Sequence, residues 1–233
     1  SRFVESGWSV KSLHRLILNS AAYQQSSEFD ATAAEADPDA RLLWRFNRRR
    51  LSAEEIRDAM LLVSGELDRS PGGEHPFPAV ESWGFSQHAP YYGVYPTNRR
   101  SVYLMQQRLK RHPFLSLFDG ADVNVSTSRR ELTTVPTQAL YLMNSDFVHE
   151  RAASVAKQIL AADTEQAARL RSLFERTLGR PPHSSEIVDS SSFLDSYSQA
   201  LAETGMPENE REQAVWSGLV RTVLTRNEFL FVD

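Results

Sequence analysis

The sequence predicts a mainly α-helical fold: a helical array with a long irregular middle segment rich in aromatic residues and arginine, and with room for one short strand pair. Three observations predict this class. Apolar residues recur at helical spacing in residues 1–69 and 131–233, capping signals precede several of these stretches, and glycine and proline interrupt residues 70–130. The hydrophobic share of 41% in 233 residues suits a single domain with a substantial core.

The first helix is expected to begin after Ser9, a residue type that caps helix N-termini. Trp8 before it and Leu13 at the fourth helical position have the spacing of a hydrophobic staple. Apolar residues then recur on one face of this helix: Val10, Leu13, Ile17 and Ala21.

Two more helices are expected before residue 70. A polar loop over residues 26–37 ends at Asp37-Pro38, which favours a short helix over residues 41–46. Ser52-Ala53-Glu54-Glu55 has the pattern of a capping box and predicts the next helix start. The buried face of that helix is expected to hold Ile56, Met60, Val63 and Leu67.

Residues 70–130 are expected to be irregular, because nine glycine and proline residues from Pro71 to Pro96 break any helical pattern. So long a stretch in a compact domain is more often functional, or packed across a surface, than disordered. Residues 101–105 fit one short strand, and residues 113–118 fit one or two helical turns. The segment is rich in aromatic residues: Phe77, Trp83, Phe85, Tyr91, Tyr92, Tyr95 and Tyr103.

Helical signals return at Pro136 and again after Ser145. A third stretch stops at Gly179, a fourth starts at Ser184 and stops at Gly205, and a last helix follows. The last three helices are joined by short loops, which favours antiparallel packing. The expected buried residues of the five helices are Ala139, Leu140 and Met143; Phe147, Ala152, Val155 and Ile159; Leu170, Leu173, Phe174 and Leu178; Ile187, Leu194, Tyr197 and Leu201; and Val215, Leu219, Val223 and Leu224.

Composition excludes several classes of function. The net charge of −4 is close to that of an average globular protein, so we expect neither nucleic acid nor a membrane surface as a partner. The apolar runs are far shorter than the roughly 20 residues of a membrane span. Because the chain has no cysteine, disulfides, thiolate metal sites, cysteine nucleophiles and covalently attached haem are excluded within it.

Ordered strings of residues along the chain resemble a planctomycete-type family known as domain of unknown function 1553. The strings are Gly7-Trp8-Ser9 with Leu13-His14-Arg15-Leu16-Ile17, Ser20 and Tyr23; Asp37-Pro38 with Leu42-Leu43-Trp44-Arg45; Arg49-Arg50-Leu51 with Glu54, Ile56, Arg57 and Asp58; Gly72-Gly73; Arg100-Ser101-Val102-Tyr103; Phe118-Asp119 with Asp122; Arg129-Arg130 with Thr133-Thr134-Val135-Pro136, Gln138-Ala139-Leu140 and Asn144-Ser145; and Asn227-Glu228-Phe229.

The resemblance implies an exported or periplasmic protein in which this chain is the C-terminal part, beside a second uncharacterised domain and often a cytochrome c-like domain upstream. We therefore expect no cofactor in this segment, with any haem carried upstream. The chain starts at Ser1 without an initiator methionine and enters a helix almost at once. It is interpreted as the C-terminal portion of the family domain, with an N-terminal helical part removed.

Paired arginines lie next to or within the irregular segment and are the main candidates for binding an anion or other ligand. From residue 41 to residue 130 there are fourteen basic and nine acidic residues, although the whole chain is acidic. If the pairs converge, their guanidinium groups could hold a carboxylate, sulfate or phosphate in a bidentate manner. Alternatively, they pair with nearby carboxylates and hold loops onto helices. The candidates are Arg49, Arg50, Arg99, Arg100, Arg129 and Arg130, together with Tyr103.

Aromatic residues beside these arginines could stack on sugar rings or furnish a core for a loop-rich segment. Asp119, Asp122 and Asn124 offer oxygen atoms of the kind that calcium prefers, but their spacing is not that of an EF-hand, and turn formation is the alternative. His75, His88 and His112 lack zinc-site spacing, so no metal is expected. His14, Asp58, Asp119 and Asp122 are weaker site candidates, and no nucleophile motif supplies a partner for His14.

The function predicted from these observations is a non-catalytic interaction or scaffold domain of an exported multidomain protein. Its expected partners are the upstream domains of the same polypeptide and a polysaccharide or other anionic ligand. The alternative is a hydrolytic or redox-assisting enzyme domain that acts on polysaccharide, with its site in the irregular segment. Acid–base sites leave little trace in one sequence, so the residues alone do not decide between these two classes.

Overall fold

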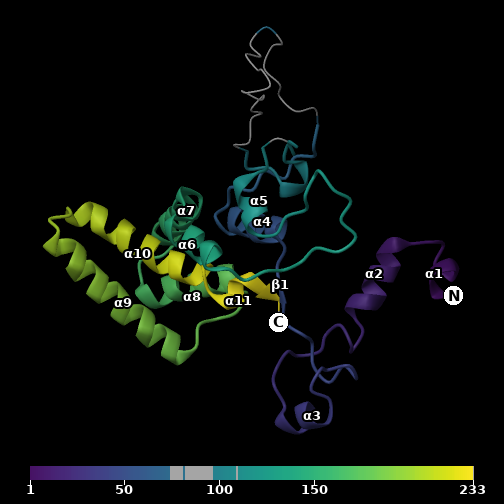
Figure 1. The fold of residues 1–233 in the computed structure, drawn as a ribbon. Helices are drawn as coiled ribbons and strands as arrows, with labels where there is room; N and C mark the ends of the chain where they lie inside the picture. Colours follow the sequence, from purple (N-terminus) through teal and green to yellow (C-terminus); the bar gives the residue numbers. More distant parts are fainter. Residues whose placement is uncertain (74–80, 82–96, 109, 233) are drawn as a thin grey trace. The chain divides into compact units, whose positions relative to one another are not determined.

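The structure is a computed structural model that describes residues 1–73, 81, 97–108 and 110–232. These residues confirm the mainly helical class, with eleven α-helices and one two-stranded antiparallel sheet (Figure 1). The chain divides into two compact units, Ser1–Arg50 with the chain end from Phe231, and Leu51–Leu230. None of the described helices is both long enough and apolar enough to cross a membrane.

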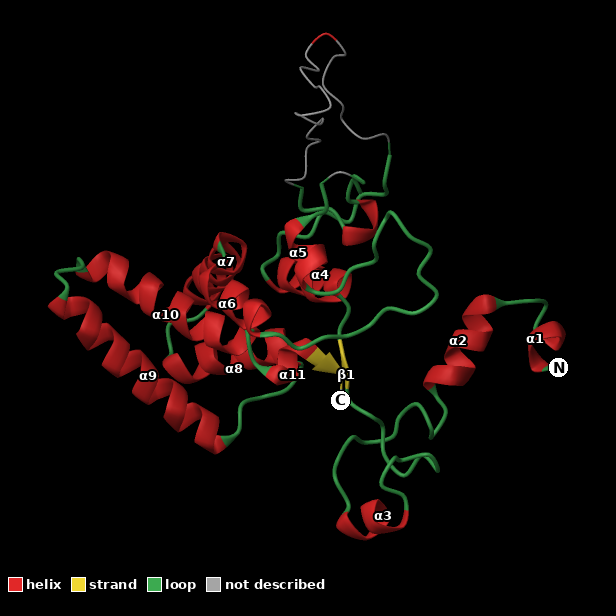
Figure 2. Cartoon of the chain, viewed as in Figure 1, coloured by secondary structure: helices red, strands yellow, loops and turns green. Residues whose placement is uncertain are grey.

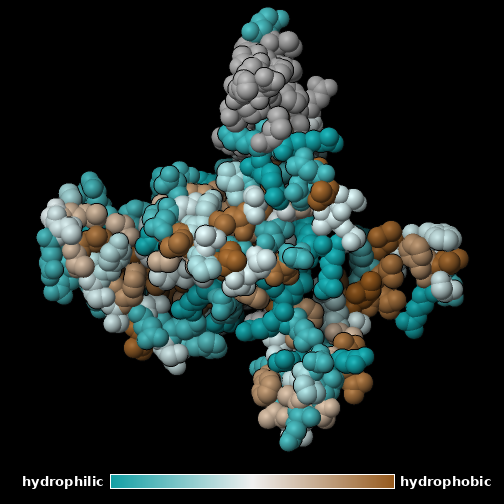
Figure 3. Space-filling view, viewed as in Figure 1, coloured by the Kyte–Doolittle hydropathy of each residue, from teal (hydrophilic) through white to brown (hydrophobic). Residues whose placement is uncertain are grey.

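The first unit contains α1 (Arg2–Glu5), α2 (Val10–Leu18), α3 (Ala31–Ala36) and the strand pair of β1 (Arg49–Arg50) and β2 (Phe231–Val232). Arg49 lies opposite Val232 and Arg50 opposite Phe231. The helix start at Ser9 is confirmed, because its hydroxyl accepts a hydrogen bond from the Ser12 nitrogen at 3.2 Å. The apolar face of α2 stays at the surface, where Figure 3 shows hydrophobic side chains gathered over α1 and α2.

The helix expected over residues 41–46 is wrong. A short helix lies instead within the expected polar loop, at α3, whose N-cap Asp30 accepts from the Ala33 nitrogen at 2.8 Å. Residues 41–46 form turns because Ala40 and Leu43 have φ angles of 51° and 59°, which a right-handed helix does not allow. The Asp37 carboxylate also accepts a hydrogen bond from the Leu42 nitrogen at 2.7 Å, and this bond closes a local turn.

The second unit begins with α4 (Ala53–Val63), the 3₁₀ helix η2 (Ser101–Tyr103) and α5 (Pro113–Leu117). The predicted capping box is present: the Glu55 nitrogen donates to Ser52 Oγ at 3.3 Å, and Glu55 Oε2 accepts from the Ser52 nitrogen at 2.7 Å. The strand expected over residues 101–105 is wrong. The Tyr103 nitrogen bonds the Arg100 carbonyl at 2.9 Å, which turns the chain into η2.

Five longer helices and one short helix complete this unit: α6 (Pro136–Asn144), α7 (Asp146–Ala162), α8 (Gln166–Leu178), α9 (Ser184–Glu203), α10 (Glu208–Leu224) and α11 (Asn227–Leu230). The central helix α10 packs against both α7 and α9, and Figure 2 shows α9 and α10 running side by side. Fully buried residues of α7, α8 and α10 form the core: Val148, Val155, Ile159, Leu170, Leu173, Phe174, Val220, Val223 and Leu224.

The buried face of α6 differs from the expectation. Leu140 and Met143 are 56% and 62% exposed, whereas Gln138 and Leu142 are buried. Gln138 can be buried because its Nε2 donates to the Leu117 carbonyl at 2.9 Å. Helical periodicity alone would place this polar side chain at the surface.

Arg180 ties the ends of three helices together. Its guanidinium bonds Glu186 on α9 at 2.8 Å and Glu228 on α11 at 2.6 Å, directly after α8 ends at Gly179. Arg226 adds a further bond to Glu186 at 2.6 Å. The hydrogen bonds from Arg180 lower the pKa of Glu186 to about 2. This network fixes the turn that leads from α8 into α9.

Candidate functional site

Arg57 is a buried residue of the second unit that contacts the predicted site residue Arg99. It lies on α4 between the buried residues Ile56 and Met60 and is only 4% exposed. Its Nη1 donates to the Arg99 carbonyl at 3.1 Å and to Ser101 Oγ at 3.2 Å, and its Nη2 donates to the Thr97 carbonyl. Burial lowers the pKa of Arg57, and the neighbouring Asp58 carboxylate partly opposes this effect.

Asp58 and Asp68 hold residues 98–101, from the middle of the irregular segment, close to α4. Asp58 accepts from the Ser101 nitrogen at 2.8 Å and from the Ser101 hydroxyl at 2.7 Å. The Asp68 nitrogen bonds the Asn98 carbonyl at 2.8 Å, and the Asp68 carboxylate lies 3.5 Å from Arg99 Nε. The chain that leaves at Asp68 therefore returns beside α4, where Arg57 holds it.

Aromatic and charged side chains of α5 and α7 surround Arg57. The guanidinium groups of Arg57 and Arg151 lie 5.8 Å and 5.2 Å from the centroid of the Phe147 ring, within range of a cation–π contact. Arg151 also bonds Glu66 at 3.0 Å. His112 caps α5, and burial together with the charge of Arg57 lowers its pKa to about 4. His112 is therefore neutral near pH 7.

A groove of about 500 Å³ lies where the start of α4, η2, α5 and residues 121–123 meet. Its apolar floor includes Leu104 and Leu115, each 5% exposed. Ser52, Gln106 and Arg130 are among the polar residues that line it. Such an open depression with an apolar base and a polar border suits a ligand that has both apolar and polar faces.

Arg130 and Glu54 form an ion pair at this groove. Arg130 Nη1 lies 2.6 Å from Glu54 Oε2, and the side chains are 39% and 22% exposed. Because the pair is open to water, its contribution to stability is small, of the order of 1 kcal/mol at most. The guanidinium has further N–H groups that an arriving anion can bind.

Comparison with protein-family models gives one result that covers most of the chain. The model described as PSD1, protein of unknown function (DUF1553), matches residues 1–194. The chain belongs to the DUF1553 family. Comparisons with curated proteins and with solved structures gave no match. The family string Asn227-Glu228-Phe229 lies beyond the matched residues, in α11.

The predicted arginines of this DUF1553 chain fall in different structural settings. Arg49 and Arg50 form β1 in the first unit, with Arg50 buried and Arg49 exposed. In the second unit, Arg99 pairs with Asp68 and Arg130 with Glu54. Arg100 and Arg129 are exposed. The convergence of all three pairs around one ligand stays a prediction, because the structure does not place the two units relative to one another.

The other candidates are mostly held by local contacts. Tyr103 is 37% exposed, and its ring lies against Gly72, where a Cβ atom would come within 2.4 Å of Tyr103 Cδ1. His14 is exposed on α2. The candidates Phe77, Trp83, Phe85, Tyr91, Tyr92, Tyr95, His75 and His88 lie outside the described residues.

The carboxylates considered for calcium accept hydrogen bonds from protein donors. Asp119 accepts from the Thr133 nitrogen at 2.9 Å and from the Thr133 hydroxyl at 2.8 Å. Asp122 accepts from the Asn124 nitrogen at 2.9 Å, and this bond lowers the pKa of Asp122. Across the described ranges, no group of three or more histidine or acidic side chains could hold a metal ion.

The role of Arg57 was not predicted from the sequence. A signal was present, because Arg57 falls on the same helical face as Ile56, Met60 and Leu61, so a helical projection puts its charge in the core. Buried arginine requires several acceptors, which in this protein are the carbonyls and hydroxyl of residues 97–101. Nothing local in the sequence identifies those acceptors.

Proposed function

We propose that this chain is a non-catalytic interaction domain of an exported multidomain protein, and that the groove at Arg130 binds an acidic polysaccharide. One observation carries the proposal: a partly exposed guanidinium borders a groove with an apolar floor. The ring faces of a sugar chain can rest on Leu104 and Leu115, while a sugar carboxylate reaches Arg130. The exported setting and the haem-bearing upstream partner rest on the family resemblance.

The acidic residues near the groove support a binding role over a catalytic one, because their oxygens are used to hold the fold. Glu55 Oε2 accepts from the Ser52 nitrogen, Asp58 accepts from Ser101, and Asp119 accepts from Thr133. Glu54 is bonded to Arg130. A general acid or base needs a proton-accepting atom directed at substrate, whereas these carboxylates are directed at protein donors.

The exposed ion pair explains how a ligand could enter without a large rearrangement. Arg130 is already held at the groove by Glu54, so its side chain loses little freedom when a ligand binds. A ligand carboxylate can bind the guanidinium N–H groups that Glu54 leaves available. Because the contact is ionic and open to water, we expect binding to weaken as the salt concentration rises.

The proposal is tested by affinity electrophoresis and calorimetry with polygalacturonate as the acidic probe and dextran as the neutral one. We expect polygalacturonate to bind and dextran to bind far less, with Arg130→Ala weakening polygalacturonate binding about tenfold. The control is Arg171→Ala, which removes another exposed arginine whose ion pair with Glu175 lies within α8.

Two results would contradict this function. If the Arg130→Ala and Arg171→Ala variants bound polygalacturonate equally well, binding would not take place at the groove. Release of new reducing ends from polygalacturonate by the chain would establish that the chain cleaves this polymer and would replace the binding role with a catalytic one.

A further inference from the structure

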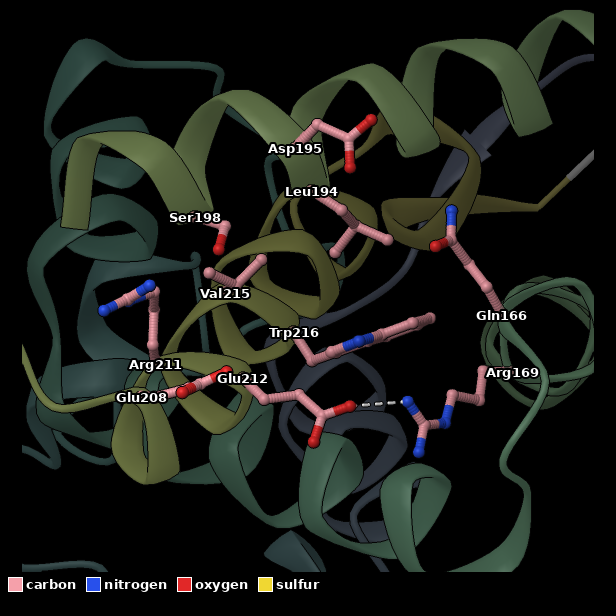
Figure 4. A pocket seen from close by; sticks show the side chains of 10 residues that line it. All are labelled: Gln166, Arg169, Leu194, Asp195, Ser198, Glu208, Arg211, Glu212, Val215 and Trp216. Carbon is pink, nitrogen blue, oxygen red and sulfur yellow. Dashed lines mark hydrogen bonds and ion pairs between the residues drawn. The ribbon is translucent and has the colours of Figure 1, made fainter. Parts of the chain in front are cut away.

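The second unit contains another hollow, lined by residues of α8, α9 and α10, that shares no lining residue with the groove at Arg130. Its volume is about 280 Å³. Leu194, Val215 and Trp216 form its apolar base, and each is at most 6% exposed. Figure 4 shows the Trp216 indole lying between Leu194 and the bonded pair of Glu212 and Arg169.

Hydrogen-bond donors and acceptors both line this hollow. Arg169 donates from Nε to the Asp163 carbonyl and from Nη1 to Glu212, at 2.7 Å each. Its Nη2 is left for a ligand. Arg211 bonds the Met206 carbonyl at 3.0 Å, and its buried Nε has no hydrogen-bond partner among the described residues.

The acceptors are carboxylates. Asp195 on α9 and Glu208 at the start of α10 line the hollow, and their carboxylates have no hydrogen bond or ion pair with the described residues. Glu212 bonds Arg169 through Oε1 and keeps Oε2 for another donor. Both kinds of polar group thus have spare bonding capacity around one apolar base.

We propose that this hollow binds one neutral sugar ring. A hydroxyl group donates to carboxylates and accepts from guanidinium groups, so a polyhydroxylated ring satisfies both sets of side chains. Two guanidinium groups and three carboxylates line the hollow, so its charges nearly cancel and a neutral polar ligand can bond both kinds of group. The carbon face of the ring covers the apolar base beside Trp216.

The size of the hollow restricts the ligand to a single ring. Pockets for drug-sized molecules measure roughly 300–1,000 Å³, and the hollow is slightly below this range. This site does not rest on the proposed function of the groove at Arg130, because the two linings are different and the ligands differ in charge.

The test is saturation-transfer NMR on the full chain with methyl β-glucopyranoside, methyl β-galactopyranoside, methyl α-mannopyranoside and N-acetylglucosamine as probes, and cadaverine as a cationic probe. We expect at least one sugar to bind saturably, with a dissociation constant of the order of millimolar and with little dependence on salt. Asp195→Ala and Glu208→Ala should each weaken that binding about tenfold.

The matched control is Asp189→Ala, an exposed carboxylate on the same helix as Asp195 and outside the hollow. Because Asp195 and Glu208 are exposed, their variants should keep the thermal midpoint of the parent, which the same samples report. Arg130→Ala should leave sugar binding unchanged, which separates this site from the groove.

Three results would overturn the proposal. The first is that none of the four sugars binds. The second is binding that Asp195→Ala and Glu208→Ala leave unchanged. The third is cadaverine binding that these substitutions abolish and that falls steeply with salt, which would make the hollow a cation site.

Discussion

Asp58 accepts two hydrogen bonds from Ser101, one from the backbone nitrogen at 2.8 Å and one from the hydroxyl at 2.7 Å. The two residues are 43 positions apart, and the bonds attach the start of η2 to α4. Ser101 also accepts from Arg57 at 3.2 Å. One serine thus joins the carboxylate and the guanidinium of neighbouring helical residues.

Replacing Asp58 with alanine is expected to lower the free energy of unfolding by about 2–3 kcal/mol, because a charged acceptor is lost and Arg57 keeps its buried charge without the adjacent carboxylate. Ser101→Ala removes only the hydroxyl and should cost about half as much. Urea denaturation followed by circular dichroism measures both. Equal and small effects would show that Asp58 does not hold the returning chain.

Ser52→Ala is expected to destabilise the second unit by about 1 kcal/mol, because the Ser52 side chain accepts from the otherwise unsatisfied Glu55 nitrogen. The measurement is the urea midpoint of the variant against that of the parent. Ser52→Asp restores a capping oxygen and should recover most of the loss. An unchanged midpoint in Ser52→Ala would count against the capping box at α4.

Gly120→Ala is expected to cost about 1–3 kcal/mol through overpacking. A Cβ atom there would lie 2.6 Å from the Leu115 carbonyl oxygen, and that oxygen belongs to the backbone of α5 and cannot rotate away. Gly73→Ala is the matched control, since a Cβ atom at Gly73 meets none of the described residues within 4 Å. Thermal melts of both variants test the difference, and similar midpoints would contradict the close approach.

Stability in acid is expected to depend on Glu186. Its pKa is lowered to about 2 in the folded chain from a usual value of 4.5. The unfolded chain therefore binds more protons between these two pH values, and the contribution of Glu186 is complete above pH 4.5 and lost as pH falls towards 2. We expect a loss of about 2–3 kcal/mol over this window.

Urea denaturation at a series of pH values between 2 and 6 measures this loss. The Glu186→Gln variant should be less stable than the parent at pH 6 and should show a flatter acid limb. Glu175→Gln is the control, because Glu175 pairs with Arg171 on an exposed helix face and contributes little. If the free energy of unfolding fell equally steeply with falling pH in the parent and in Glu186→Gln, other groups would cause the acid sensitivity.

Local sequence patterns predicted the features that depend on contacts within a turn or two. The capping box at Ser52, the helix start at Pro136 and the stop at Gly179 were all predicted, because each is made by atoms a few residues apart. The family was also determined from ordered strings, most of which lie in the matched residues 1–194.

The tertiary structure alone decided which polar side chains enter the core and what they bind. Helical periodicity assigned Leu140 to the interior, yet Gln138 is buried because a carbonyl from α5 meets it. Arg57 donates to the Thr97 carbonyl, the Arg99 carbonyl and Ser101 Oγ. These acceptors lie 40, 42 and 44 residues further along the chain. Bonds over such separations depend on how the chain closes its loops, and no local pattern encodes them.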